Sequence, residues 1–128
     1  MTINEILTKV NELNPNQYTD AIMISWLSEL EWKLVHVIFE QHDYPDEEFQ
    51  ERVEEFAGYT EDSINDEVLV PDEFCSLYEN YLRAMIAFNN NEGIRYQNAM
   101  QMFNTNFGDY AAYYNRKNLP HSNQLSLF

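Results

Sequence analysis

The residues that could bind a metal ion in this chain are the acidic side chains that follow residue 61. An EF-hand calcium loop starting at Asp62 would need oxygen ligands at its first, third and fifth positions, a glycine at the sixth and a glutamate at the twelfth. The chain supplies Asp62, Asp66 and Glu73 at the first, fifth and twelfth positions. However, Ile64 stands at the third position and Glu67 at the sixth. These mismatches favour a solvated acidic loop over a calcium site.

Four further residues could take part in catalysis, and their surroundings indicate structural roles instead. His36 and Glu40 share one helical face, but His42 is not where the H-E-x-x-H pattern of zinc sites requires its second histidine. We therefore expect a structural histidine at the edge of the core. Cys75, the single cysteine, has the apolar neighbour Phe74 and acidic residues nearby, which favours a buried thiol over a nucleophile.

The chain also lacks the other common patterns of catalytic and cofactor sites. It has no G-x-S-x-G nucleophile turn and no glycine-rich loop for phosphate. A lone cysteine excludes an internal disulfide and a multi-thiolate metal site. The sequence predicts that the protein is not an enzyme and uses no cofactor, metal or small-molecule substrate.

The composition is typical of one acidic globular domain. The 128 residues are 45% hydrophobic and 15% aromatic, which is enough to form a core. The formal net charge is −15, so nucleic-acid phosphates should be repelled. Thirteen of the 22 acidic residues lie between Asp43 and Glu73, where Arg52 is the only cation, and we call this segment the acidic block. With no signal peptide or bilayer-spanning run in the sequence, we expect a soluble intracellular protein without a membrane partner.

The apolar spacing predicts an all-α fold: a small bundle of four to five helices with a C-terminal αα-hairpin, an acidic loop excursion and a flexible tail. A short first helix is expected between the capping box of Thr2 with Glu5 and Pro15, with one apolar face of Ile3, Ile6, Leu7, Val10 and Leu13. A long core helix should run from an N-cap at Thr19 to about His42. Its apolar stripe consists of Ile22, Met23, Trp26, Leu27, Leu30, Leu34, Ile38 and Phe39.

Within the acidic block the helical pattern is weaker. Pro45 could occupy the first position of a short helix that carries Phe49, Val53 and Phe56 on one face and stops at Gly58. Crowded like charges oppose this helix. The next stretch, TEDSIND, is expected to be a loop, and EVLV a short extended piece.

The last two helices should pack as an antiparallel pair, because the NNNEG turn between them is short. The first should begin at Pro71-Asp72, and Gly93 is expected as the C′ residue of the turn. The predicted core faces are Phe74, Leu77, Tyr78, Tyr81, Leu82, Met85 and Ile86, then Ile94, Ala99, Met102, Phe103, Phe107, Tyr110, Ala111 and Tyr114. The helical pattern ends near residue 115, so we expect a domain over 1–115 and a tail over 116–128.

Aromatic side chains form a stripe along this predicted hairpin. Base-stacking surfaces usually combine aromatic side chains with Arg or Lys, and cations are sparse here. We therefore expect the stripe to pack in the core, with some exposed tyrosine edges that suit a protein–protein contact. Its members are Tyr78, Tyr81, Phe103, Phe107, Tyr110, Tyr113 and Tyr114.

The stretch LVPDEFCSLYENYLRAMIAFNNNEGIRYQNAMQMFNTNFGDYAAYYNR resembles the hairpin of small head–tail connector proteins (adaptor, or head-completion, proteins) from tailed phages and prophages of Gram-positive bacteria. The family pattern combines V-P-x-x-[FY]-x-x-L-Y-x-x-Y-L, an acidic-plus-glycine turn, and M-x-x-F-N followed by Y-A-x-Y-Y-N-R. The segment NPNQYTDAIMISWLSELEWKL is similar to the family's N-P-N-x-[FY] and W-L-S-E-L motifs. The matching hairpin residues are Val70, Pro71, Phe74, Leu77, Tyr78, Tyr81, Leu82, Glu92, Gly93, Met100, Met102, Phe103, Asn104, Tyr110, Ala111, Tyr113, Tyr114, Asn115 and Arg116.

This resemblance covers the chain up to Arg116 and implies a structural protein of the virion. Such subunits form a homo-oligomeric ring under the portal protein, extend the DNA exit channel and contact tail-completion proteins. The expected locations are the bacterial cytoplasm during assembly and then the virion head–tail junction, with DNA passing unbound. The acidic block could line that channel, where it would repel DNA, or form a solvated rim. The residues involved would be Glu47, Glu48, Glu51, Glu54, Glu55, Glu61, Asp62, Asp66 and Glu67.

The tail departs from the family pattern, which often ends in basic and aromatic residues. This chain ends in the apolar peptide QLSLF, formed by Gln124, Leu125, Ser126, Leu127 and Phe128. The resemblance implies that the peptide contacts the portal, by strand addition or in an apolar groove. The peptide is also similar to the motif with which bacterial polymerases and repair proteins bind the sliding clamp. Clamp binding through this peptide is therefore one alternative function. A second alternative is that the acidic protein mimics DNA and inhibits a DNA-handling enzyme.

Overall fold

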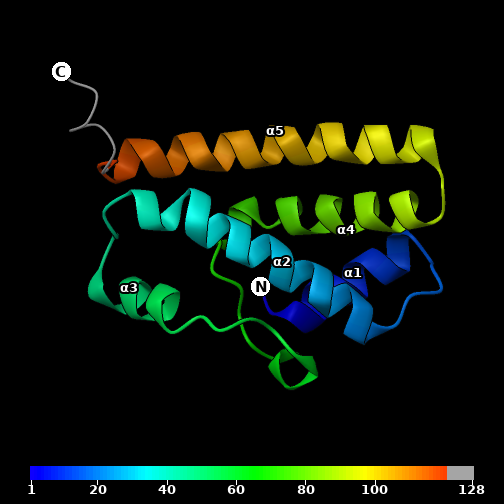
Figure 1. Ribbon diagram of the computed structural model, residues 1–128, viewed down its shortest axis with the longest axis horizontal. Coiled ribbons are helices and arrows are strands. Elements are labelled where there is room, and N and C mark those ends of the chain that lie inside the picture. Colours follow the sequence, from blue (N-terminus) through cyan, green and yellow to red (C-terminus); the bar gives the residue numbers. More distant parts are fainter. Residues whose placement is uncertain (121–128) are drawn as a thin grey trace.

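The computed structural model describes residues 1–120. Within that range the chain forms five α-helices, three short 3-10 turns and no strand, which confirms the predicted all-α fold. No helix of this range is both long and apolar enough to cross a bilayer. The helices are α1 (Ile3–Leu13), α2 (Asp20–Val37), α3 (Glu47–Glu54), α4 (Ser76–Asn89) and α5 (Gly93–Lys117) (Figure 1).

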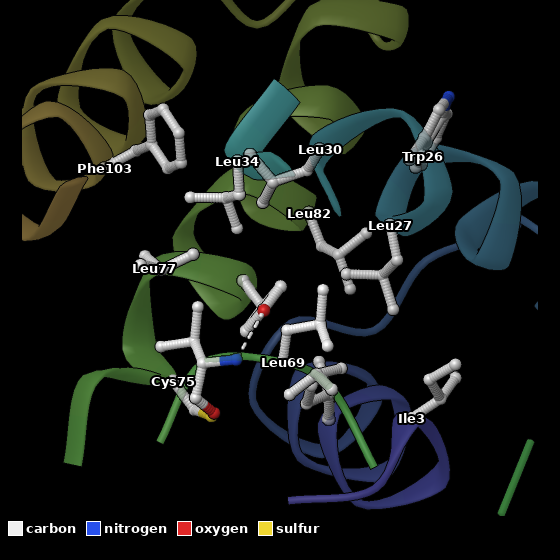
Figure 2. Packing of buried hydrophobic residues seen from close by; sticks show 14 of the residues in the cluster. Ile3, Trp26, Leu27, Leu30, Leu34, Leu69, Cys75, Leu77, Leu82 and Phe103 are labelled. Atoms are coloured by element: carbon white, nitrogen blue, oxygen red, sulfur yellow. Dashed lines mark hydrogen bonds between the residues drawn. The ribbon is translucent and has the colours of Figure 1, made fainter. Parts of the chain in front are cut away.

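Helix α4 is the centre of the bundle. It contacts α5 on one side and both α1 and α2 on the other. Figure 1 shows α3 and the loop after it on the side of α2 that faces away from α5. Buried side chains from α1, α2, α4 and α5 meet in one core, and Figure 2 labels among them Ile3, Leu27, Leu30, Leu34, Leu77, Leu82 and Phe103.

Helix α1 begins as the sequence predicts. The Thr2 side chain accepts a hydrogen bond from the Glu5 N–H at 3.2 Å, and the Glu5 carboxylate accepts one from the Thr2 N–H at 2.8 Å. Two further N–H groups of the first turn donate to backbone carbonyls of the acidic block, Ile3 to Asp66 at 3.0 Å and Asn4 to Ile64 at 2.8 Å. The apolar face is shorter than predicted, because Leu13 at the end of the helix is 64% exposed.

Helix α2 starts at the predicted N-cap, where the Thr19 hydroxyl accepts a hydrogen bond from the Ile22 N–H. The expected end near His42 is wrong: α2 ends at Val37, and a 3-10 turn, η1, covers Phe39–Gln41. The reason is local, because the His42 ring contacts the Ile38 carbonyl at 2.7 Å in place of the backbone N–H that would continue the helix.

Helix α3 confirms the short helix expected in the acidic block, but not its start. Asp46 is the N-cap and accepts a hydrogen bond from the Phe49 N–H at 2.7 Å, so Pro45 lies before the helix and not at its first position. Gly58 follows with a positive φ of 95°, and a second 3-10 turn, η2, covers Glu61–Ser63. The piece Val68–Val70 is buried beside α4, and its residues lie in no regular element.

The turn between α4 and α5 differs from the prediction in one residue. A 3-10 turn, η3 (Asp72–Phe74), leads into α4, and after α4 it is Asn91, with φ 58°, that adopts the left-handed conformation. The Glu92 N–H donates to the Ala87 carbonyl and the Asn91 N–H to the Phe88 carbonyl, which is a Schellman arrangement. Gly93 is therefore the first residue of α5 and not the C′ residue, because asparagine tolerates the left-handed region.

Helix α5 is covered on one side only. Three of its 25 residues, Phe103, Tyr110 and Tyr114, are buried. The predicted core positions Ile94 and Met102 are 78% and 54% exposed, since among the described elements α4 makes the main contact with α5. The helix continues to Lys117, two residues past the expected end. The next residues then run antiparallel to residues 42–43, with the Asp43 N–H donating to the Leu119 carbonyl at 2.8 Å.

Candidate interaction surfaces

The carboxylates of the acidic block form one exposed surface, which we call the acidic face. Helix α3 turns Val53 inward and its glutamates outward, and the loop after it presents its acidic residues around η2. Of the nine carboxylates predicted for this surface, only Glu67 has an ion pair within residues 1–120, at 4.0 Å from the N-terminal ammonium group, which also pairs with Asp72. The exposed residues are Glu47, Glu48, Glu51, Glu54, Glu55, Glu61, Asp62, Asp66 and Glu67, so all nine predicted side chains are available to a partner.

Arg52, the single cation of the acidic block, is used to hold the block together. Its guanidinium group donates a hydrogen bond to the Val68 carbonyl at 3.0 Å and lies over the Phe49 ring at 5.9 Å. It therefore ties α3 to the chain that follows η2 and forms no ion pair with a carboxylate in the described part of the chain. Within the described part of the chain, the acidic face is thus neutralised by no side-chain cation, and only Glu67 pairs with the N-terminal ammonium group.

The residues of the calcium pattern lie in different local structures. Asp62 is part of η2 and Glu73 part of η3, and Ile64 is half-buried. The carbonyls of Ile64 and Asp66 accept the hydrogen bonds from α1 described above. No group of three or more potential metal ligands gathers within residues 1–120. The conformation of this loop is therefore tied to the start of α1.

A buried carboxylate that the sequence analysis did not single out lies at the base of the acidic block. Glu31 of α2 is fully buried. Its Oε2 accepts hydrogen bonds from the Tyr59 hydroxyl at 2.5 Å and the Leu69 N–H at 3.0 Å. Its Oε1 accepts one from the Tyr78 hydroxyl at 2.6 Å, and that hydroxyl accepts one from the Val70 N–H at 3.3 Å. This Glu31 network joins α2, α4 and two parts of the acidic block.

Burial raises the pKa of Glu31 above its usual value of 4.5, and the three hydrogen bonds and the charge of Arg52 act in the opposite direction. Burial beside this carboxylate also raises the pKa values of Tyr59 and Tyr78. A signal for the network exists in the sequence, because Glu31 lies four residues after Leu27 and three before Leu34, within the apolar stripe of α2. A charged residue at such a position requires partners.

His36 is exposed and Cys75 is buried, and their contacts are typical of structural side chains. His36 is exposed, stacks on Trp32 at 5.5 Å and contacts Glu40 at 2.8 Å, so it lies further out than the predicted core edge. Cys75 is buried as predicted, and burial raises the pKa of its thiol to about 12. A thiol of this kind is a poor nucleophile because its thiolate form is scarce at neutral pH.

The aromatic stripe packs in the core, as predicted. Tyr78, Phe103, Tyr110 and Tyr114 are buried, and Tyr81, Phe107 and Tyr113 are partly buried against them. Adjacent rings make edge and tilted contacts, for example Tyr81 with Phe103 at 5.4 Å and Phe74 with Tyr110 at 5.1 Å. These rings therefore join α5 to the bundle and do not form a stacking surface for bases.

The outer face of α5 is exposed and almost uncharged. Residues 96–115 contain a single charged side chain, Asp109, in a chain with 22 acidic residues. The exposed positions in this range are otherwise amide, hydroxyl and small or apolar side chains: Gln97, Asn98, Gln101, Met102, Asn104, Thr105, Gly108, Ala112 and Asn115. Long-range repulsion is weak over such a surface, so a second acidic protein can approach it.

A groove with a volume of about 420 Å³ lies between the end of α5, the start of α3 and residues 67–72. Aromatic rings from Phe49, Tyr110, Tyr113 and Tyr114 line it, with the apolar residues Pro45, Val68, Leu69, Val70 and Pro71. Two of the seven cations, Arg52 and Lys117, are also at its wall, beside Glu67 and Asp72. This groove forms between segments distant in sequence, so residue patterns along the chain do not predict it.

The predicted partner-binding peptide, Gln124 to Phe128, lies outside the described residues, so the structure leaves its role as a prediction. Comparisons of the chain with protein-family models, curated proteins and solved structures give no match.

Proposed function

We propose that the protein is a structural subunit of the head–tail connector of a tailed phage or prophage. In this proposal copies of the chain form a ring under the portal protein, and the ring extends the DNA exit channel and receives tail-completion proteins. The chain has no catalytic role in this function, and the peptide Gln124 to Phe128 contacts the portal. The proposal begins from the resemblance of residues 14–34 and 69–116 to connector proteins.

The observation that carries the proposal is the segregation of charge over the surface. The acidic face presents nine exposed carboxylates, and no side-chain cation within residues 1–120 forms an ion pair with them. A channel lined by such faces repels the phosphates of DNA and lets DNA pass without binding. A protein that bound DNA would need the opposite charge.

The outer face of α5 supports the ring. It is exposed along most of the helix, and residues 96–115 bring a single charge to it. Copies of a chain with net charge −15 repel one another, and contact through an uncharged surface minimises that repulsion. The two surfaces lie on different sides of the bundle, since α3 is across α2 from α5 (Figure 1).

The test is native mass spectrometry of the full chain, alone and with the purified portal ring from the same phage or prophage genome. We expect a monomer alone and several copies bound per portal ring in the mixture. The double variant Leu127→Asp, Phe128→Ser should lose portal binding. The control Glu47→Gln, Glu51→Gln on the exposed side of α3 should keep it, because DNA passage and not portal contact depends on that face.

Two outcomes would replace the proposal. Absence of portal binding, together with tail-dependent binding to a bacterial sliding clamp, would favour the clamp-binding alternative. Absence of portal binding, together with binding to a DNA-handling enzyme that DNA competes away, would favour the DNA-mimic alternative. Binding to the DNA-handling enzyme should then be lost in the Glu47→Gln, Glu51→Gln variant and kept in the Leu127→Asp, Phe128→Ser variant.

A further inference from the structure

We propose that the groove between α3, residues 67–72 and the end of α5 is the binding site for the apolar tail of the same chain. The occupant is the segment Leu125 to Phe128, bound in cis. This inference does not depend on the connector proposal, because it concerns a contact within one chain. It gives the tail a resting site, from which a partner with a better apolar groove can remove it.

The chemistry of the groove fits this occupant. Its wall combines aromatic rings with the aliphatic side chains of Val68, Leu69 and Val70. The volume of about 420 Å³ is in the range of sites that enclose a few large apolar side chains. The tail supplies three such side chains, Leu125, Leu127 and Phe128, within four residues.

The described part of the backbone ends beside the groove. Lys117 and Asn118, the last residue of α5 and the one after it, are themselves part of the groove wall. The chain then runs antiparallel to residues 42–43, and the Leu119 carbonyl accepts a hydrogen bond from the Asp43 N–H. Asp43 is two residues before Pro45, which lines the groove, so the chain leaves the described part at the rim of the groove.

The length of the tail is sufficient for binding in cis. Ser126 is six residues past Pro120, and six extended residues span about 20 Å at ~3.4 Å each. Because the groove wall contains Asn118, the tail needs only a fraction of that reach. The effective concentration of so short a tether is in the millimolar range, which favours the groove of the same chain over that of a second copy.

Charge is compatible with the same occupant. Residues 121–128 contain no Asp, Glu, Lys or Arg, so Leu125 to Phe128 bring no charged side chain to the groove. The groove wall contains Arg52, Lys117 and the N-terminal ammonium group of Met1, and that ammonium group is paired with Glu67 and Asp72. A segment with uncharged side chains leaves these ion pairs undisturbed.

The experiment is disulfide trapping in the full chain. In the variant Pro45→Cys, Ser126→Cys one cysteine is at the groove and the other in the tail, and we expect rapid formation of an intramolecular disulfide. The control is Ala112→Cys, Ser126→Cys, because Ala112 is exposed on the side of α5 away from the groove and also within reach of the tail. The groove pair should form at least tenfold faster. Native Cys75 does not compete, because it is buried and its thiol has a pKa of about 12.

A second variant separates docking from simple tethering. Adding Leu125→Ser and Leu127→Ser to the groove pair should slow disulfide formation to the rate of the control, with an unchanged helical circular dichroism spectrum. Equal rates for the groove pair and the Ala112 pair would overturn the proposal. Mixed disulfides between isotopically light and heavy chains would overturn binding in cis and assign the groove to the tail of a second copy.

A readout without cysteines is also available. Amide chemical shifts of Val68, Leu69 and Tyr113 should change between the wild-type chain and the Leu125→Ser, Leu127→Ser variant. Unchanged shifts there would contradict docking. Loss of portal binding in the experiments above leaves this result unaffected, so the two proposals can fail separately.

Discussion

The α4–α5 hairpin and the acidic block are both anchored to the same bundle, but different interactions hold them. The hairpin is joined by aromatic rings, such as Tyr81 with Phe103 and Phe74 with Tyr110. The acidic block buries Val53 and Val68 to Val70 in the core and is joined in addition by directional hydrogen bonds, because the Tyr59 hydroxyl and the Leu69 N–H donate to Glu31. Apolar burial along one face holds a helix with a regular pattern, whereas the charged segment without such a pattern adds a few buried polar contacts to its apolar ones.

The apolar contacts that join the α4–α5 hairpin can be tested with the variant Phe103→Ala. Phe103 is 3% exposed and lies between α4 and α5, so its removal leaves a cavity in the seam. We expect a loss of about 4 kcal/mol in the free energy of unfolding, measured by urea denaturation. Met102→Ala, at an exposed neighbouring position, should change it by less than about 0.5 kcal/mol. Similar losses for the two variants would contradict one-sided packing of α5.

The hydrogen bonds of the Glu31 network, which join the acidic block to the bundle, can be tested with the variant Glu31→Ala. This change leaves two tyrosine hydroxyls and the Leu69 N–H without their acceptor, and we expect a loss of about 3 kcal/mol in the free energy of unfolding. Amide hydrogen exchange should accelerate at Leu69 more than within α4. Exposed Glu47→Ala is the matched control and should be close to neutral. Uniform acceleration over the whole chain would mean that Glu31 does not act mainly on the acidic block.

The path of the acidic block can be tested by Gly58→Ala. Gly58 has φ 95°, and an added Cβ would lie 3.2 Å from the Ser28 Oγ, the atom that accepts a hydrogen bond from the Tyr59 N–H at 2.9 Å. We expect a loss of about 2 kcal/mol by thermal or urea unfolding. Gly108→Ala in α5 is the opposite case, because nothing lies within 4 Å of an added Cβ, and it should gain about 0.7 kcal/mol. A neutral Gly58→Ala would rule out strain at this turn.

The smallest expected effect is a pH dependence that separates Glu31 from the exposed carboxylates. Burial raises its pKa in the folded protein above 4.5, so between 4.5 and the folded pKa the folded state binds more protons than the unfolded state. The contribution of Glu31 to stability is therefore complete below pH 4.5 and falls as pH rises through the folded pKa. The difference in unfolding free energy between wild type and Glu31→Gln should decline over this window, and a rise would contradict the assignment.

The sequence predicted the parts of the fold that depend on local pattern. The capping box of Thr2 with Glu5, the N-cap at Thr19 and the hairpin seam all follow from residue type and helical spacing. The nine residues of the acidic face are exposed as the charge pattern suggested. These features need no knowledge of distant segments.

The errors came partly from local contacts that helical periodicity does not describe, and partly from contacts between distant segments. The end of α2 depends on the His42 ring, and the C′ position went to Asn91 although Gly93 was close by. Met102 has the spacing of a core residue but is 54% exposed. The Glu31 network and the groove both require segments that are far apart in sequence, so neither could be found from periodicity.

The non-local hydrogen bonds at the start of α1 affect the order in which the chain folds. Its local capping box is complete once residue 5 has left the ribosome, whereas the acceptors for Ile3 and Asn4 are synthesised about 60 residues later. Since synthesis adds roughly 5–20 residues per second, several seconds pass in which the Ile3 and Asn4 N–H groups can bond only to water. The N-terminal helix thus reaches its final form only after the most acidic third of the protein has emerged.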